Sequence, residues 1–160
     1  MKSVIQRVSR GSVKIGEDYY REIGTGMVVL IGVHKDDTEA DAKKLAEKIC
    51  NLRIFNDENE KLNLSIQDVH GEMLIISQFT LYGDCKRGNR PSFTDSANAE
   101  KGNQLYELFV KECKQILGEE RVKTGIFGAM MTVEIINEGP VTIIAHTDYN
   151  KTLSEKWKNE

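Results

Sequence analysis

A short polar segment after an apolar run carries the side chains best suited to chemistry. The segment is Ser77–Tyr82 (SQFTLY), and it offers hydroxyl and amide groups. If it continues the preceding strand, the two-residue period places Gln78 and Thr80 on one face and Ser77 and Phe79 on the other. A strand that turns polar at its end can bind a ligand there. The alternative is that Thr and Phe are simply good strand residues and that Gln78 satisfies a nearby backbone group.

A second distinctive segment is Asn137–Pro140 (NEGP), which lies between two apolar runs. Asn and Gly tolerate positive φ and Pro fixes φ, so the segment predicts a turn that joins two strands. Gly139 before Pro140 is unusual in a tight hairpin, because proline removes a donor from the ladder. A cis bond between them is compatible with the sequence, but few X–Pro bonds are cis and the sequence alone does not establish one.

Other hydrolytic chemistries lack their sequence motifs. The three histidines are scattered and none belongs to HExxH; they are His34, His70 and His146. There is no G-x-S-x-G elbow, P-loop or GxGxxG motif. The three cysteines, Cys50, Cys85 and Cys113, form no CxxC, and we expect Cys50 and Cys113 to be buried in helix faces. A serine triad or a zinc site therefore has no support, and we expect no metal and no cofactor.

The pattern of apolar residues predicts the elements that must hold these groups. We expect one helix to begin at Thr38, which matches a capping box with Asp41, and a second to begin near Asp95 or Ser96 and stop at Gly118. Alternation and apolar runs predict strands at residues 2–15, 19–23, 27–34, 72–82, 121–124, 129–136 and 141–147. Two main helices among about eight strands indicate a mixed α/β domain with a curved, largely antiparallel, barrel-like sheet.

The composition is that of an ordinary soluble protein. The chain has 160 residues, which fits a single domain over 1–160, with 39% hydrophobic and 29% charged residues. Its longest apolar run, Met27–Ile31, is too short to cross a bilayer, and the N-terminus has no signal-peptide core. We therefore expect a cytoplasmic protein without membrane contact. The charged last residues, 150–160, are expected to form a mobile tail.

The net charge of -3 argues against a protein that coats long nucleic acid. It does not exclude an enzyme that touches only the end of an RNA, where a few phosphate contacts suffice. One local basic cluster, Lys86, Arg87 and Arg90, could make such contacts. The alternative is that these residues form a solvated loop without a partner.

The two polar segments, in this order, resemble one known family. SQFTLY and NEGPVT, together with MKSVIQRVSRGSV near the start and RPSFTDSA and FGAMMTVEII between them, resemble the D-aminoacyl-tRNA deacylase family. The resemblance covers nearly the whole chain as far as Thr147, and the pair of segments is specific. It implies a homodimer that hydrolyses the ester joining a D-amino acid to the 3′-terminal adenosine of tRNA.

The resemblance also implies the residues of the site. Gly139 and Pro140 would form a Gly–cisPro dipeptide that reaches into the partner subunit's site, where its carbonyl groups reject L-aminoacyl esters and admit D-aminoacyl and glycyl esters. Arg7 would hold this dipeptide in place. The residues implied for the catalytic wall are Ser77, Gln78, Phe79 and Thr80, and those implied to lie near the pocket are Met131, Phe93 and Ala97.

The sequence offers no evident base for a nucleophilic threonine. A threonine hydroxyl needs one to attack an ester, and no group is evidently placed to serve Thr80. We therefore favour assistance by the neighbouring ribose hydroxyl of the terminal adenosine. Thr80 and Gln78 would orient the reactants, and the amide of Phe79 would face the carbonyl oxygen.

Two other functions compete with deacylation of tRNA. A non-catalytic RNA-binding module would use the basic loop, although the sequence has no aromatic stacking motif of the RNP1 kind. A small-molecule esterase of the same fold would hydrolyse free D-amino esters without tRNA. A deacylation assay on D-aminoacyl-tRNA separates the first from the proposed enzyme.

Overall fold

The structure is a computed structural model that describes residues 1–147. Its strands are β1 (Lys2–Ile15), β2 (Tyr19–Ile23), β3 (Gly26–Gly32), β4 (Phe55–Asn56), β5 (Leu62–Leu64), β6 (Glu72–Ser77), β7 (Val122–Thr124) and β8 (Thr132–His146). Its helices are α1 (Glu39–Cys50) and α2 (Ala99–Leu117), with short 3₁₀ helices η1 (Phe79–Tyr82) and η2 (Glu119–Arg121). The predicted mobile tail at 150–160 lies outside the described residues.

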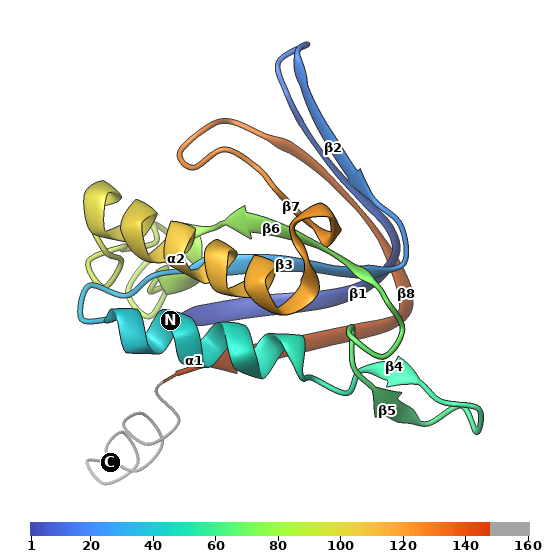
Figure 1. Cartoon of the computed structure of the whole chain (residues 1–160). Coiled ribbons are helices and arrows are strands. Elements are labelled where there is room, and N and C mark those ends of the chain that lie inside the picture. Colours follow the sequence, from blue (N-terminus) through green and yellow to red (C-terminus); the bar gives the residue numbers. More distant parts are fainter. Residues whose placement is uncertain (148–160) are drawn as a thin grey trace, which may run out of the picture.

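One six-stranded sheet forms the body of the fold (Figure 1). Its order is β2-β1-β3-β6-β7, and β8 pairs with β1 along nearly the whole of both strands. The pairs of β1 with β2, β3 and β8 are antiparallel, whereas β6 is parallel to β3 and to β7. β1 serves three neighbours because it is long: residues 2–8 pair with β3, residues 11–15 pair with β2, and β8 lies along the other edge.

The sheet curls until its two end strands meet. Tyr19 on β2 donates its hydroxyl to the carbonyl oxygen of Thr124 on β7, at 2.8 Å. The interior of the curl is filled by the buried side chains of Val8, Val13, Ile23, Val28, Leu74 and Ile76. Burial of such apolar surface is the main driving force for closing a sheet in this way. The expected mixed α/β fold with a curved, barrel-like sheet and two main helices is confirmed.

The two α-helices cover the opposite face of the sheet (Figure 1). The predicted apolar face of α1 is buried and consists of Ala42, Leu45, Ala46, Ile49 and Cys50. Cys50 and Cys113 are both fully buried, as expected. A hydrogen bond with Cys50 and burial raise the pKa of the Cys113 thiol, so that it stays protonated.

The predicted start is confirmed for α1 and is wrong for α2. The capping box of α1 is present, and Asp41 accepts bonds from both the amide and the hydroxyl of Thr38 at 2.8 Å. The predicted start of α2 near Asp95 or Ser96 is wrong. Its N-cap is Asn98, whose side-chain oxygen accepts the amide of Lys101 at 2.9 Å, and Ser96 instead forms a bridge with His34.

Two strand predictions and one turn prediction need correction. The strand predicted over 72–82 ends at Ser77, because the next residues form η1, so Gln78 and Thr80 do not continue the two-residue period of β6. The turn predicted at Asn137–Pro140 is also wrong. Those residues lie inside the single long strand β8, where they form a bulge opposite β1. The residues 129–131, predicted as strand, precede β8.

Candidate active site

The chain leaves the sheet directly after Ser77. The amide of Gln78 still donates to the carbonyl of Ile31 on β3, at 2.7 Å. The following bonds are local and helical, from Leu81 to Gln78 at 3.2 Å and from Gly83 to Thr80 at 2.9 Å. Ser77 and Gln78 are consequently half-buried, whereas Phe79 and Thr80 are exposed. The catalytic wall expected from the sequence is therefore a short 3₁₀ turn at the carboxyl end of β6.

Two residues that sequence reasoning missed support this turn. Lys2 on β1 donates from Nζ to the carbonyl of Leu81 at 3.2 Å and lies 4.9 Å from the centroid of the Tyr82 ring. The His34 ring is 5.2 Å from the same Tyr82 ring. No local motif marks Lys2 or His34, because only the pairing of β1, β3 and β6 brings them to η1.

The polar groups of the turn are neutral. Nε2 of Gln78 donates to Oγ1 of Thr80 at 2.5 Å. The first amides of a helix have no partner inside it, so the main-chain amides of Phe79 and Thr80 can face a ligand. The titratable groups at the turn are the Tyr82 phenol, Lys2 and His34, whose Nδ1 accepts the amide of Asp36 at 3.1 Å. The turn thus supplies donors for a developing negative charge and no carboxylate or amine base of its own.

An aromatic pair and a basic loop lie beside the turn. The rings of Phe79 and Phe93 meet edge to face, with centroids 5.2 Å apart. Two main-chain bonds between Asp84 and Ser92, at 2.8 and 2.9 Å, close the loop between the rings. The basic residues expected to contact RNA, Lys86, Arg87 and Arg90, are exposed in this loop. The structure therefore brings Phe93 to the expected catalytic wall and places the basic cluster on the loop that joins the two rings.

Met131 and Ala97 also lie near the end of the sheet. Met131 packs against Gly125. A Cβ added to Gly125 would fall 2.4 Å from the sulfur of Met131 and 3.3 Å from the side chain of Ile76. The amide of Ala97 donates to the carbonyl of Val33 at 2.9 Å, just beyond the end of β3. Both residues thus lie next to the strands β3 and β6 that lead into the turn.

The NEGP segment forms a bulge opposite a buried arginine. Gln6 pairs with Thr142 and Val8 with Asn137, so the four residues 138–141 stand opposite Arg7 alone. Arg7 is only 7% exposed, and its Nε donates to the carbonyl of Glu138 at 3.1 Å. This contact agrees with the expected role of Arg7 in holding the segment.

The dipeptide itself is exposed. The Gly139–Pro140 bond is cis, as the resemblance implied, and Gly139 has a φ of 121°. Both residues are open to solvent. An added Cβ on Gly139 would fall 3.0 Å from Nη2 of Arg7. The positive φ therefore favours glycine there, and an added Cβ would in addition press on the guanidinium.

Within one chain the dipeptide does not reach the catalytic wall. Arg7 pairs with Met27, and Met27 pairs with Met73, four residues before Ser77. The bulge on β8 is thus three strand spacings from β6, about 14 Å, and is displaced by four residues, about 13 Å, along it. The two segments that the resemblance assigns to one site are therefore separated by roughly 15–20 Å in a single chain.

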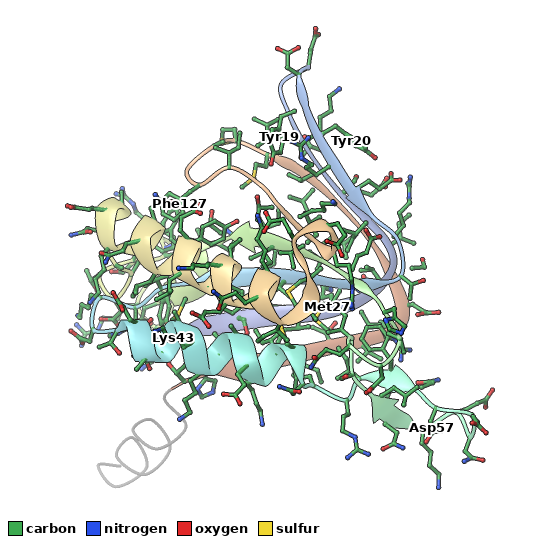
Figure 2. The ribbon with its side chains drawn as sticks, viewed as in Figure 1. Tyr19, Tyr20, Met27, Lys43, Asp57 and Phe127 are labelled. Carbon is green, nitrogen blue, oxygen red and sulfur yellow. The ribbon has the colours of Figure 1, made fainter. Side chains whose placement is uncertain are left out.

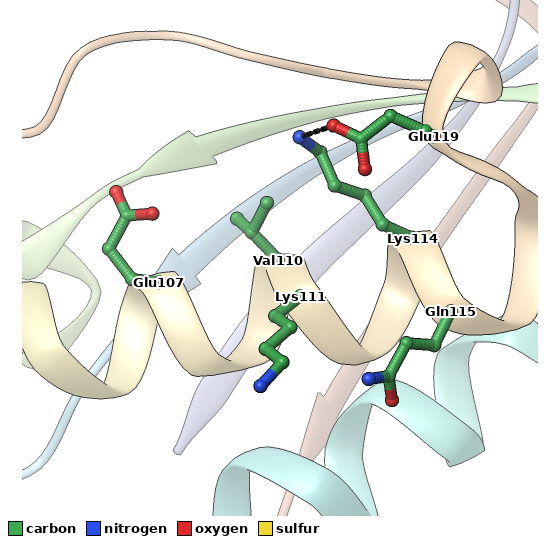
Figure 3. A pocket seen from close by; sticks show the side chains of 6 residues that line it. All are labelled: Glu107, Val110, Lys111, Lys114, Gln115 and Glu119. Atoms are coloured by element: carbon green, nitrogen blue, oxygen red, sulfur yellow. Dashed lines mark hydrogen bonds and ion pairs between the residues drawn. The ribbon is translucent and has the colours of Figure 1, made fainter.

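Two cavities in the described part of the chain lie away from these segments. One, of about 360 Å³, is a groove on α2 that contains Lys111 and an ion pair between Lys114 and Glu119 (Figure 3). Another, of about 580 Å³, lies between α1 and the end of β8 and is lined by Leu45, Lys48 and His146 among others. Neither is lined by a residue of the catalytic wall or by the dipeptide.

Two further findings concern residues 1–147 only. No helix there is both long and apolar enough to span a membrane. No group of three or more His, Cys, Asp or Glu side chains in that range is arranged to hold a metal ion.

Comparison with solved structures identifies close relatives of the fold. A protein named c-Myc DNA Unwinding Element Binding Protein superposes with a TM-score of 0.87 and 39% identity, over 92% of this chain and 99% of its own. A probable eukaryotic D-amino acid tRNA deacylase superposes with a TM-score of 0.81 at 20% identity, over 91% of this chain and 98% of its own. At that identity the second likeness concerns the fold alone.

Comparison of sequences identifies the family. A D-aminoacyl-tRNA deacylase of Dictyoglomus turgidum is 51% identical over 148 residues, which cover 92% of this chain and 94% of the relative. A protein of the same name from Fervidobacterium nodosum is 54% identical over 144 residues, covering 90% and 95%. The family model described as D-Tyr-tRNA(Tyr) deacylase matches residues 4–146. The chain with this neutral 3₁₀ turn and this arginine-held bulge belongs to the D-Tyr-tRNA(Tyr) deacylase family.

Proposed function

We propose that the chain hydrolyses the ester bond of D-aminoacyl-tRNA and of glycyl-tRNA, as a homodimer in the cytoplasm, and rejects L-aminoacyl esters with the Gly139–Pro140 dipeptide. The family and the names of its relatives support the reaction. One observation carries the rest. Phe79 and Thr80 of the catalytic wall and the dipeptide are exposed, yet wall and dipeptide are too far apart in one chain to form one site. A second copy of the chain can supply the missing half.

An apolar row on the sheet, exposed at its Ile144 end, supports the homodimer. Ile144 pairs with Val4, Val4 with Leu30, and Leu30 with Ile76, so the four side chains point to one face. This face is opposite the helices, since Leu30 and Ile76 belong to the core inside the curl. Ile76 is buried, Val4 and Leu30 are half-buried, and Ile144 is 61% exposed. Exposed apolar surface of this kind marks interfaces, and the row runs from the strand with the dipeptide to the strand that leads into the wall.

The dipeptide filter depends on main-chain groups. Arg7 holds the carbonyl of Glu138, which fixes the chain just before Gly139. Carbonyl oxygens facing the Cα of a bound aminoacyl group would clash with an L side chain and leave room for hydrogen or a D side chain. A filter of this kind works by repelling the wrong substrate. It explains why glycyl esters would pass together with D-aminoacyl esters.

Hydrolysis adds the oxygen of a water molecule to the ester carbonyl carbon. The carbonyl oxygen becomes an oxyanion, which the main-chain amide of Phe79 would stabilise. Collapse of this intermediate breaks the bond to the ribose oxygen, which takes up a proton, and releases free amino acid and tRNA. The neighbouring ribose hydroxyl assists the proton transfer, because the turn offers no base, while Gln78 and Thr80 orient the reactants through their mutual hydrogen bond.

The basic loop would contact the phosphates at the 3′ end of tRNA. Lys86, Arg87 and Arg90 are exposed and lie next to the Phe79–Phe93 pair. A few phosphate contacts suffice for this local role in a chain with a net charge of -3.

A second candidate function is non-catalytic nucleic-acid binding. It is favoured by the name of the DNA-binding relative at 39% identity. The assay that separates the two incubates the purified chain with D-tyrosyl-tRNA, L-tyrosyl-tRNA and free D-tyrosine ethyl ester. We expect release of tyrosine from the D-tyrosyl-tRNA alone. Binding of both tRNAs without turnover would support the binding module, and turnover of the free ester at the same rate would support the small-molecule esterase.

The composite site is tested by mixing two defective chains. One variant, Gln78→Ala, alters the wall and keeps the dipeptide, whereas Gly139→Ala alters the dipeptide and keeps the wall. If each site combines the wall of one protomer with the dipeptide of the other, a heterodimer contains one intact site and regains selective turnover. If both halves belonged to one chain, the mixture would show only the average of the two variants.

A further inference from the structure

The β4–β5 hairpin is a separate braced element. β4 and β5 pair with each other and are not part of the six-stranded sheet, and the hairpin projects from the body of the molecule, with Asp57 on it (Figure 2). Asp57 accepts the amides of Lys61 and Asn59, at 3.1 and 2.8 Å, and the side-chain amide of Asn63 at 3.0 Å. These bonds hold the pKa of Asp57 below its ordinary value. The hairpin therefore has a defined shape of its own.

This hairpin meets the rest of the site at Arg7. Nη1 of Arg7 donates to the carbonyl of Ile54 at 2.9 Å and to Oδ1 of Asn56 at 3.0 Å. The opposite side of the same guanidinium faces the bulge, where Nε donates to the carbonyl of Glu138. A guanidinium is planar and its donors have a fixed geometry. Fixing Nη1 on the hairpin therefore fixes the direction in which Nε points.

We propose that Asn56 is a positioning residue for substrate selectivity, which it controls by orienting Arg7 toward the Gly139–Pro140 bulge. This inference rests on the proposed function. Among the contacts of Arg7, Asn56 supplies the side-chain acceptor at hydrogen-bond distance. The carboxylate of Glu138 is 3.8 Å from Nε and 54% exposed, so solvent screens it. Without Asn56 the guanidinium keeps the Ile54 carbonyl as a pivot and can swing away from the bulge.

The test compares three variants with the wild-type dimer. Asn56→Ala removes the acceptor, and Asn56→Asp keeps an oxygen in its place. Asn59→Ala is the matched control, because Asn59 lies on the same hairpin and bonds Asp57 through its main-chain amide, which alanine retains. We expect the ratio of D- to L-tyrosyl-tRNA turnover to fall about three- to tenfold in Asn56→Ala, as for the loss of one ordinary hydrogen bond. Asn56→Asp and Asn59→Ala should retain the wild-type ratio.

Hydrogen exchange of the backbone provides a second readout that needs no substrate. Amides of residues 137–142 should exchange faster in Asn56→Ala than in the wild type or in Asn56→Asp. Unchanged exchange there, or a D/L ratio equal to that of the wild type, would overturn the role of Asn56. A wild-type protein with no preference for D-aminoacyl-tRNA would instead contradict the proposed function, and the orienting role of Asn56 would still be decided by the exchange data.

Discussion

The catalytic wall and the dipeptide bulge are built on opposite principles. The wall is a four-residue 3₁₀ turn whose side chains reach solvent, with Phe79 56% exposed. The bulge is also exposed, but a guanidinium that is 7% exposed supports it from below. The wall therefore has exposed side chains that can adapt to a ligand, whereas the bulge is held from inside the fold by the bond of Arg7 to the Glu138 carbonyl. Under the proposed function, hydrolysis of an activated ester would tolerate the first arrangement, and chiral rejection would require the second.

The largest expected effect tests what the wall contributes. We expect tRNA ending in 2′-deoxyadenosine, with the D-amino acid on the 3′-oxygen, to be hydrolysed about a hundredfold or more slowly, as for loss of a group that assists proton transfer. Thr80→Val should leave measurable deacylation of normal substrate, since the hydroxyl would only position the reactants. Rates of release measured on the same folded protein, verified by its thermal melt, check both. An acyl-Thr80 intermediate, or full activity on the 2′-deoxy substrate, would restore threonine as the nucleophile.

The next effect concerns the apolar row that would form the dimer interface and bring the wall of one protomer to the bulge of the other. Ile144→Asp places a charge on the apolar row and should weaken dimerisation by about thirtyfold or more, because the charge would be buried without a partner. Folding of the monomer should be little affected, since Ile144 is 61% exposed. Sedimentation over a range of concentrations measures the change. Leu62→Asp, at a residue 51% exposed on β5, is the control. A wild-type chain that sediments as a monomer would remove the basis for a composite site.

A smaller effect is expected from crowding the bulge. Gly139→Ala brings a Cβ to 3.0 Å from Nη2 of Arg7 at a φ of 121°, so the dipeptide must shift. We expect the D/L turnover ratio to fall about tenfold, from strain of about 1–2 kcal/mol. Gly16→Ala is the matched control, because Gly16 also has positive φ but no neighbour within 4 Å of an added Cβ. If both variants changed selectivity alike, general backbone strain rather than the dipeptide would be responsible.

The smallest effect uses pH to separate the wall from the β4–β5 hairpin and the following turn, a segment that contacts Arg7 and through it the bulge. Bonds from the Lys61 and Asn59 amides lower the pKa of Asp57 below its ordinary value of 3.8, and bonds from Ser65 lower that of Asp68. The stabilisation they give is present above the unfolded pKa and is lost as pH falls through the folded value. We therefore expect exchange in residues 53–70 to increase below about pH 4, with no such change at the wall, which carries no carboxylate. Asp57→Asn should reduce this pH dependence, and equal loss of protection in both regions would indicate global unfolding.

The sequence by itself determined most elements and the residue types of the site. Amphipathic spacing gave the buried face of α1, and alternation gave β1 and β2. The family resemblance implied roles for the wall, the dipeptide and Arg7; the structure shows Arg7 bonded to the Glu138 carbonyl, and the roles stay predictions. These features depend on neighbours in the chain or on motifs that a sequence displays directly.

Tertiary structure alone decided how these residues are arranged. Local propensity favoured a strand through Tyr82, but β6 pairs with β3 only as far as Ser77. It also favoured a turn at Asn137–Pro140, but β8 pairs with β1 on both sides of this segment and keeps it inside the strand. Lys2 and Asn56 had no signal in the sequence, because each reaches its partner across long stretches of chain. Hydrogen bonds between distant strands fix where a strand bulges or stops, and no pattern within a few residues carries that information.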